Sequence, residues 1–288
     1  MSVDLLFYLV FLSQILLISY YYPRKILTRI SYVLKHYPAS EYPRLYPESP
    51  DKVRSGQQVF RILNLVILAI GVMLIIGYAV LSREYSDIAQ RFENMPLLYG
   101  MLQFTPLVLL EITGFKQFKL MRNADHRTCK KAELAPRRLF DYISPRLLAT
   151  AVTMFFVYLG YDLYLNQFNW TEDLIIKLFA LLACNGLFVF LTLKNLRGKK
   201  QDPYQANKDR SKQIEFATKS MAYVSILVSV FMIAVTTVNN LQLEYLDIYL
   251  YSIYFQLVAI LGCGSVLNSI RVKGIDFNVY KKERKPAH

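Results

Sequence analysis

The chain has 288 residues, of which 54% are hydrophobic, and its 34 Lys and Arg against 21 Asp and Glu give a net charge of +13. A mean hydropathy of +0.26 is high for a soluble protein, whereas a charge of +13 by itself would favour a nucleic-acid binder. Seven apolar windows total 135 residues and hold only four of the 55 charged residues. This separation excludes a soluble globular domain, a disordered chain and a disulfide scaffold.

Each apolar window contains 18 to 22 residues. As a helix rising about 1.5 Å per residue, such a window crosses about 30 Å of hydrocarbon. We therefore predict an all-α polytopic membrane protein, with a single membrane domain over residues 1–288 and seven transmembrane helices. The predicted spans are 5–22, 60–81, 97–114, 147–165, 174–193, 221–238 and 248–267.

The segments between the predicted spans alternate in charge. Segments 23–59, 115–146, 194–220 and 268–288 hold 30 of the 34 Lys and Arg and carry a net +19, while the remaining segments carry −6. The positive-inside rule predicts that the first set is cytoplasmic, with the N-terminus outside and the C-terminus inside. The positive excess then faces an anionic inner leaflet, and it gives no support to nucleic-acid binding. We expect a multi-pass protein of a plasma membrane or a bacterial inner membrane.

The first cytoplasmic segment has the most structure of its own. Apolar residues from Ile26 to Tyr37 recur at helical spacing, which predicts an amphipathic helix that lies in the inner headgroup layer and ends at Pro38. Four Tyr-Pro pairs, at 22–23, 37–38, 42–43 and 46–47, predict a non-helical strap over 37–50 that covers the ends of the helices. The alternative is a surface for a protein partner, with contact residues Arg24, Lys25, Arg29, Lys35, Tyr42 and Tyr46.

No motif for a metal, a cofactor or catalysis stands out. His126 and Cys129 lie three residues apart beside Asp125, but a zinc site normally needs four ligands, or three and a water. The chain lacks H-E-x-x-H, G-x-S-x-G, the Walker A sequence and a paired C-x-x-C. We predict no metal site, no cofactor and no catalytic residues.

Two short matches suggest an internal repeat. Residues 51–60 and 207–216 are identical at five of ten positions, and residues 84–88 and 244–248 at four of five. The matches predict two parallel three-helix units joined by the fourth span, an arrangement that some transporters adopt. Chance similarity between segments of the same composition is the alternative.

A few polar side chains fall inside the predicted spans and form the candidate site. If they converge on one cavity, they would line a pathway for a polar, mostly neutral substrate; otherwise they form hydrogen bonds between helices. Asp162 and Lys177 have opposite charges at similar depth, which predicts an ion pair or an outer gate. The candidates for the cavity are Gln14, Gln103, Glu111, Asn185 and Gln256.

Three functions are compatible with these features. The first is a transporter or channel for a small solute or ion, based on the repeat and on the polar residues within the spans. The second is a non-transporting sensor or assembly protein that presents a basic cytoplasmic face to a partner. The third is an intramembrane enzyme, with a catalytic carboxylate at Glu111 or Asp162.

Overall fold

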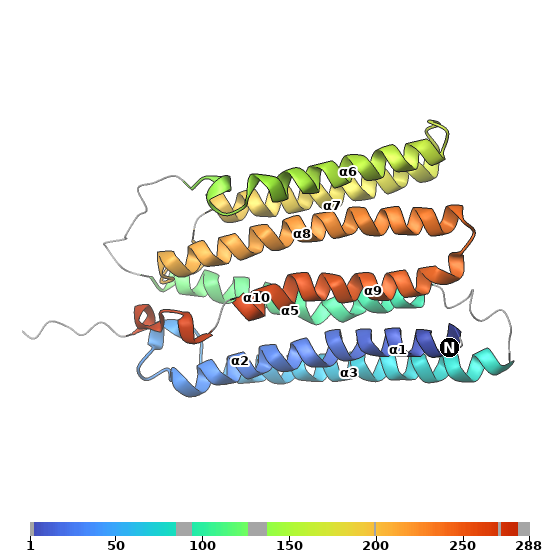
Figure 1. Ribbon diagram of the computed structural model, residues 1–288. Helices are drawn as coiled ribbons and strands as arrows, with labels where there is room; N and C mark the ends of the chain where they lie inside the picture. The colour runs from blue at the N-terminus through green and yellow to red at the C-terminus, as the bar shows by residue number, and fades with distance from the viewer. Residues whose placement is uncertain (1–2, 85–93, 126–136, 199, 270–271, 282–288) are drawn as a thin grey trace, which may run out of the picture.

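The structure is a computed structural model that describes residues 3–84, 94–125, 137–198, 200–269 and 272–281. Within these ranges the chain is helical and has no β-strand, and seven of its helices are long and apolar enough to cross a membrane (Figure 1). The prediction of an all-α chain with seven membrane-spanning helices is confirmed. The N-out, C-in orientation stays a prediction.

Two of the spans are composite helices. The first joins α1 (Val3–Ile15), a π-helical segment (Leu16–Tyr21) and α2 (Tyr22–His36), and the last joins α9 (Asp247–Ala259), a second π-helical segment (Ile260–Gly264) and α10 (Ser265–Ser269). The other spans are α3 (Pro50–Glu84), α5 (Met95–Asn123), α6 (Pro145–Leu165), α7 (Glu172–Arg197) and α8 (Asn207–Asn240). Short 3-10 turns cover Pro43–Leu45, Leu139–Asp141, Glu244–Leu246, Val272–Gly274 and Phe277–Tyr280.

Local signals in the sequence set where several helices begin. Ser144 and Thr171 cap α6 and α7, because each side-chain oxygen accepts a hydrogen bond of 3.3 Å from the backbone N–H three residues later. The turn between these two helices contains Gln167 and Phe168 at φ 53° and 60°, left-handed backbone that reverses the chain in a few residues. The fourth and fifth spans therefore form a tight antiparallel hairpin.

The first span is longer than predicted. A single helix runs over Leu5–His36, 32 residues or about 48 Å at 1.5 Å per residue, so α2 continues α1 instead of turning to lie in the headgroup layer (Figure 1). The expectation of a separate, flat helix is wrong. The π-helical segment before Pro23 lets the helix continue, because its changed hydrogen-bond spacing accommodates a residue that has no N–H. The helix ends at His36, just before Tyr37-Pro38, as expected.

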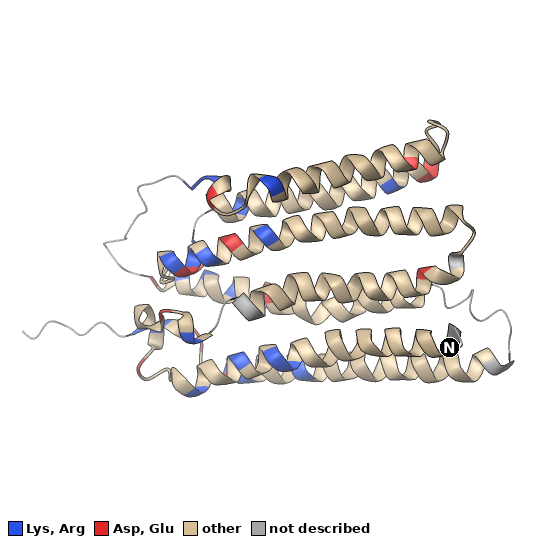
Figure 2. Cartoon of the chain, viewed as in Figure 1, with Lys and Arg blue, Asp and Glu red and all other residues tan. Residues whose placement is uncertain are grey.

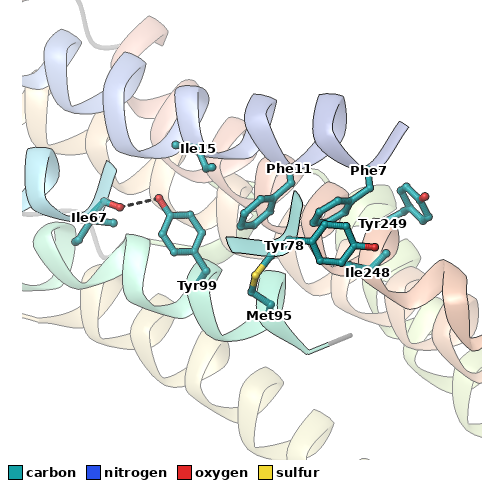
Figure 3. Close-up of a cluster of buried hydrophobic side chains, with 9 residues drawn as sticks. All are labelled: Phe7, Phe11, Ile15, Ile67, Tyr78, Met95, Tyr99, Ile248 and Tyr249. Carbon is teal, nitrogen blue, oxygen red and sulfur yellow. Dashed lines mark hydrogen bonds between the residues drawn. The ribbon is translucent and has the colours of Figure 1, made fainter. Parts of the chain in front are cut away.

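The helices pack in two groups. One contains α1, α3, α5 and α9, the other contains α6, α7 and α8, and the contact between α8 and α9 joins them. Gly100 allows the close approach of α5 and α9, because a β-carbon there would lie 2.3 Å from the Phe255 ring. Aromatic rings fill much of the first group, with Phe7, Phe11 and Tyr78 packed between its helices (Figure 3). The last span thus joins the first three in one core.

The predicted repeat is not decided by this packing. The match at residues 51–60 and 207–216 coincides with the start of α3 and of α8, two helices of 35 and 34 residues. In the second match, residues 85–88 of the first copy lie outside the described ranges, so the two copies cannot be compared. The parallel 3+1+3 arrangement stays a prediction.

Charge separates along the bundle. Figure 2 shows most Lys and Arg towards one end of the bundle, where α2 ends and α3, α6 and α8 begin, with few charges along the middle of the helices. We call this the basic end, and it carries the segments that the positive-inside rule assigns to the cytoplasm.

Candidate functional site

Two of the predicted polar residues meet in the middle of the first helix group. Gln14 of α1 donates a hydrogen bond from Nε2 to Oε1 of Gln103 in α5 at 2.9 Å, and Gln103 donates from its own Nε2 to Oγ of Ser19 at 2.9 Å. Both glutamines are almost completely buried, at 0% and 1% exposure. Together with Tyr99 they form what we call the mid-span polar cluster: Gln14, Ser19, Tyr99 and Gln103.

Tyr99 connects this cluster to α3. Its hydroxyl donates to the backbone oxygen of Ile67 at 2.9 Å (Figure 3) and lies 3.4 Å from Oγ of Ser19. A β-carbon at Gly71 would lie 2.3 Å from that hydroxyl oxygen, so the glycine provides the space that Tyr99 occupies. The cluster therefore joins α1, α3 and α5 by direct hydrogen bonds inside apolar surroundings, where such bonds hold helices together.

Gln256 reaches the first span from another side. Its Nε2 donates to the backbone oxygen of Val10 at 3.1 Å, and its Oε1 accepts from Oγ of Ser13 at 3.1 Å. Ser252, one turn earlier on α9, donates to the same Val10 oxygen at 3.3 Å. Gln256 and Ser252 therefore join α9 to α1 by hydrogen bonds.

The remaining two candidates lie apart from this cluster. Asn185 belongs to the other helix group, where it accepts a hydrogen bond from Ser225 of α8 and donates to the backbone oxygen of Leu181 at 3.0 Å. Glu111 of α5 is exposed on the surface of the bundle. The structure brings together Gln14 and Gln103, and it does not bring the five candidates around one space.

Asp162 and Lys177 do not pair with each other. Lys177 contacts the carboxylate of Asp173 at 2.5 Å, one turn away on its own helix. Asp162 is buried and accepts hydrogen bonds from Tyr158 at 2.9 Å and from Asn166 at 3.2 Å, also on its own helix. The predicted ion pair is wrong, because depth in the membrane does not fix which way a side chain points around its helix, and partners four residues away are already in reach.

The basic end carries a second structured site. Five buried residues from separate parts of the chain form a cluster that we call the tyrosine cap: Tyr42, Met121, Tyr204, Phe277 and Tyr280. Tyr37 stacks on Phe277 with 3.9 Å between the ring centroids. The predicted Tyr-Pro strap thus packs against the segment that follows the last span. It covers the helix ends, as expected.

Asp202 is the polar centre of the tyrosine cap. Its carboxylate is 7% exposed and accepts hydrogen bonds from the hydroxyl of Tyr280 and, at 2.9 Å, from the backbone N–H of Tyr204. Burial raises the pKa of the Asp202 carboxyl, and these hydrogen bonds and Lys200 only partly offset the shift. Burial and the neighbouring carboxylate raise the pKa of the Tyr280 hydroxyl. The hydrogen bond between the two side chains therefore holds together loops that are far apart in the sequence.

Two cations lie over aromatic rings of the tyrosine cap. The guanidinium of Arg44 lies 5.3 Å from the centre of the Tyr204 ring, and the ammonium of Lys281 lies 5.5 Å from that of Tyr42. Of the predicted partner residues, Tyr42 and Tyr46 belong to the strap, and Tyr46 donates to the backbone oxygen of Tyr37 at 2.8 Å. The other four, Arg24, Lys25, Arg29 and Lys35, project from α2 into open pockets.

Sequence reasoning missed the residues that organise this end. Asp202 and Tyr280 lie in segments 194–220 and 268–288, which the charge pattern identifies only as basic cytoplasmic segments, and Tyr99 is not among the predicted candidates. The sequence does contain a signal for Asp202: Asp202-Pro203-Tyr204 interrupts a basic segment with a turn sequence and an aromatic residue. His126 and Cys129 lie outside the described residues, and no group of three or more His, Cys, Asp or Glu within the described ranges is placed to hold a metal ion.

The helices and their surface define the class of the protein. Large apolar side chains cover the outside of the spans, for example Phe179 at 74% exposure and Ile176 at 68%, which suits contact with lipid chains and not with water. The protein is a multi-pass integral membrane protein. No protein-family model, curated protein or solved structure matches the chain.

Proposed function

We propose that the protein is a non-transporting sensor or assembly protein, whose tyrosine cap binds an acidic segment of a partner protein at the cytoplasmic membrane surface. The observation that carries this proposal is the cap itself. It is built from residues near positions 42, 121, 204 and 280, so the segments between the spans share a buried core of their own.

Ordering a loop costs conformational entropy, and a loop that only connects two spans does not need to be ordered. Fixing the backbone of one residue costs about 1–2 kcal/mol of conformational entropy, and loops positioned on a rigid scaffold are where binding surfaces commonly occur. Here the ordered loops hold Arg44 and Lys281 over aromatic rings on the surface of the cap. A fixed set of cations attracts and orients an acidic partner.

The polar residues within the spans support a structural role more than a pathway. Gln14, Gln103 and Gln256 bond to neighbouring helices, and Asn185 belongs to the other helix group. Each such hydrogen bond in a membrane protein contributes about 0.6–2 kcal/mol to association of the helices. Apart from Oε1 of Gln14, these contacts explain the buried polar groups without a substrate.

The proposal is tested by photo-cross-linking in native membranes. A photoreactive residue replaces Glu41, which is exposed on the strap, and a second version carries it at Asn169, which is exposed at the opposite end. We expect one discrete adduct from position 41 and none from position 169. The adduct should be identified by mass spectrometry and should contain an acidic segment at the cross-linked peptide.

Charge dependence separates specific binding from random capture. Lys281→Glu reverses a charge on the cap and should weaken the adduct, whereas the matched change Lys116→Glu, on the exposed surface of α5, should not. Higher salt should weaken the adduct as well, because surface charges are screened within about 10 Å at 0.1 M salt. An adduct that ignores Lys281→Glu, or no discrete adduct at position 41, would overturn the proposal.

Transport is the second candidate function, and one observation favours it. Oε1 of Gln14 is buried and accepts no hydrogen bond within the described part of the chain, and the π-helical segment begins two residues later. Irregular turns of this kind are frequent at functional sites. Uptake of a neutral polar solute into proteoliposomes that is lost in Gln14→Leu, with the cap variants unaffected, would favour transport over binding.

A further inference from the structure

An open pocket of about 630 Å³ lies beside α2 at the basic end. One wall is the face of α2 and the other is the end of the last span with the turn that follows it, at Leu267, Val272 and Lys273. None of the five residues of the tyrosine cap lines the pocket, although Val272 in its wall also packs against the cap. The lining from the first span includes Tyr20 and Tyr21 of the π-helical segment and Arg24, Lys25 and Arg29 of α2.

Among the described residues that line this pocket, all the charged ones are positive. They are Arg24, Lys25, Arg29 and Lys273, and none of the described lining residues is Asp or Glu. A ligand with a negative charge is the complement of such a wall. Arginine is especially suited to a phosphate, since its guanidinium can donate two parallel hydrogen bonds to the phosphate oxygens.

Aromatic and backbone contacts hold these cations in place. Arg24 donates to the hydroxyl of Tyr20 at 2.9 Å, and Lys25 lies 5.7 Å from the centre of the Tyr21 ring. Arg29 donates to the backbone oxygen of Leu267 at 3.4 Å and so joins α2 to the end of the last span. Positioned donors lose less side-chain freedom when a ligand binds.

The place of the pocket along the helix indicates an amphiphile. Towards the middle of the span the helix surface is apolar and open, with Leu16 at 48% exposure and Tyr20 at 46%. The predicted span ends at Tyr22, so Leu16 lies within the hydrocarbon and Arg24 lies just beyond its edge, towards the headgroup layer. A phospholipid whose phosphate lies at Arg24 would place its acyl chains along this apolar surface.

We propose that this pocket binds the phosphate headgroup of an anionic phospholipid from the leaflet at the basic end. Arg24, Lys25, Arg29 and Lys273 hold the phosphate, and the apolar surface near Leu16 and Leu267 contacts the acyl chains. This inference goes beyond the proposed function, because the ligand is a lipid and the residues are not those of the tyrosine cap. Lipid binding and partner binding can therefore be tested with different variants.

Native mass spectrometry of the detergent-purified full chain tests the inference with phosphatidylglycerol, with phosphatidylcholine of the same acyl chains, and with glycerol phosphate. We expect the protein to bind phosphatidylglycerol in preference to the other two. The triple variant Arg24→Gln, Lys25→Gln, Arg29→Gln should bind phosphatidylglycerol about 100-fold more weakly, since each surface-proximal basic residue contributes about a factor of five.

The matched control removes the same charge from a second pocket at the same end. Lys35→Gln, Arg54→Gln and Arg61→Gln alter a groove of about 500 Å³ between α2 and α3, and this variant should bind phosphatidylglycerol like the wild type. An equal loss in both triple variants would overturn the inference, because it would mean that lipid follows the general positive charge. Equal binding of phosphatidylcholine would overturn it too, and equal binding of glycerol phosphate would mean a site for free phosphate esters.

A second measurement uses the unaltered protein, in case the triple variant does not fold. A photoreactive phosphatidylglycerol incorporated into nanodiscs should cross-link to peptides that contain residues 20–32 and 267–273. Cross-links spread evenly over the basic end would overturn the inference. Lys281→Glu, the variant that tests the tyrosine cap, should leave the cross-links to the pocket unchanged.

Discussion

Removal of one hydroxyl from the tyrosine cap should loosen the loops that it joins. In Tyr280→Phe the ring remains packed beside Tyr204 and Phe277, but the hydrogen bond to the carboxylate of Asp202 is lost. A hydrogen bond to a charged group contributes about 1.5–3 kcal/mol, and Asp202 keeps its backbone donor at Tyr204. We expect the free energy of local opening of the cap to fall by about that amount.

Hydrogen–deuterium exchange of the protein in nanodiscs measures this change directly. Backbone amides in 37–46, 201–206 and 272–281 should exchange about 10- to 100-fold faster in Tyr280→Phe, while amides in α6 and α7 stay as in the wild type. Tyr164→Phe is the control, because Tyr164 is 68% exposed at the opposite end. Unchanged exchange in the three cap segments would refute the role of the Asp202–Tyr280 contact. Faster exchange throughout the bundle would refute the view that the cap opens as a local unit.

Three further outcomes are expected. Gly100→Ala should destabilise the contact between α5 and α9 by about 1–3 kcal/mol, since the new β-carbon meets the Phe255 ring at 2.3 Å. Gly160→Ala, where the new β-carbon has open space, should not destabilise the protein. Thermal unfolding in detergent compares the two variants, and equal melting temperatures would contradict the packing. The hydroxyl of Tyr280 has a raised pKa, so it should ionise above pH 10. The stability that the neutral hydroxyl gives the cap should be present below that pH and should be lost as the pH rises further. An ultraviolet difference titration of the wild type against Tyr280→Phe measures the ionisation, and ionisation at the usual pH of a tyrosine would contradict the prediction. In a background without the native cysteines, Leu243→Cys should react with an impermeant thiol reagent added outside intact cells and Gln205→Cys should not, and the reverse pattern would refute the orientation.

The sequence predicted the spans because their number and length depend on properties that add up locally. A run of about 20 apolar residues has few alternatives to a transmembrane helix, since each unsatisfied backbone polar group in lipid costs several kcal/mol. Proline geometry, which is also local, predicted the end of α2 before Pro38 and the strap that follows, although the strap contains a 3-10 turn at Pro43–Leu45. It could not predict that α2 continues α1 in one helix, because that depends on the π-helical hydrogen bonds before Pro23.

The candidate site was predicted only as a set of residue types. Gln14 and Gln103 were identified as polar residues within spans, but their contact depends on which helices are neighbours. Asp162 and Lys177 were assigned to each other from opposite charge and similar depth, but each contacts a partner on its own helix. Asp202 and Tyr280 are 78 residues apart, and no local pattern connects them.

The sequence by itself determined that this is a seven-helix membrane protein with its basic residues at one end, because hydropathy and charge are sums over neighbouring residues. Only the tertiary structure decided which polar groups meet. In a bilayer all the lipid-facing surfaces are similarly apolar, so the pairing of helices follows from close packing and from a few hydrogen bonds. The same holds at the basic end, where the tyrosine cap brings together loops that the sequence keeps apart.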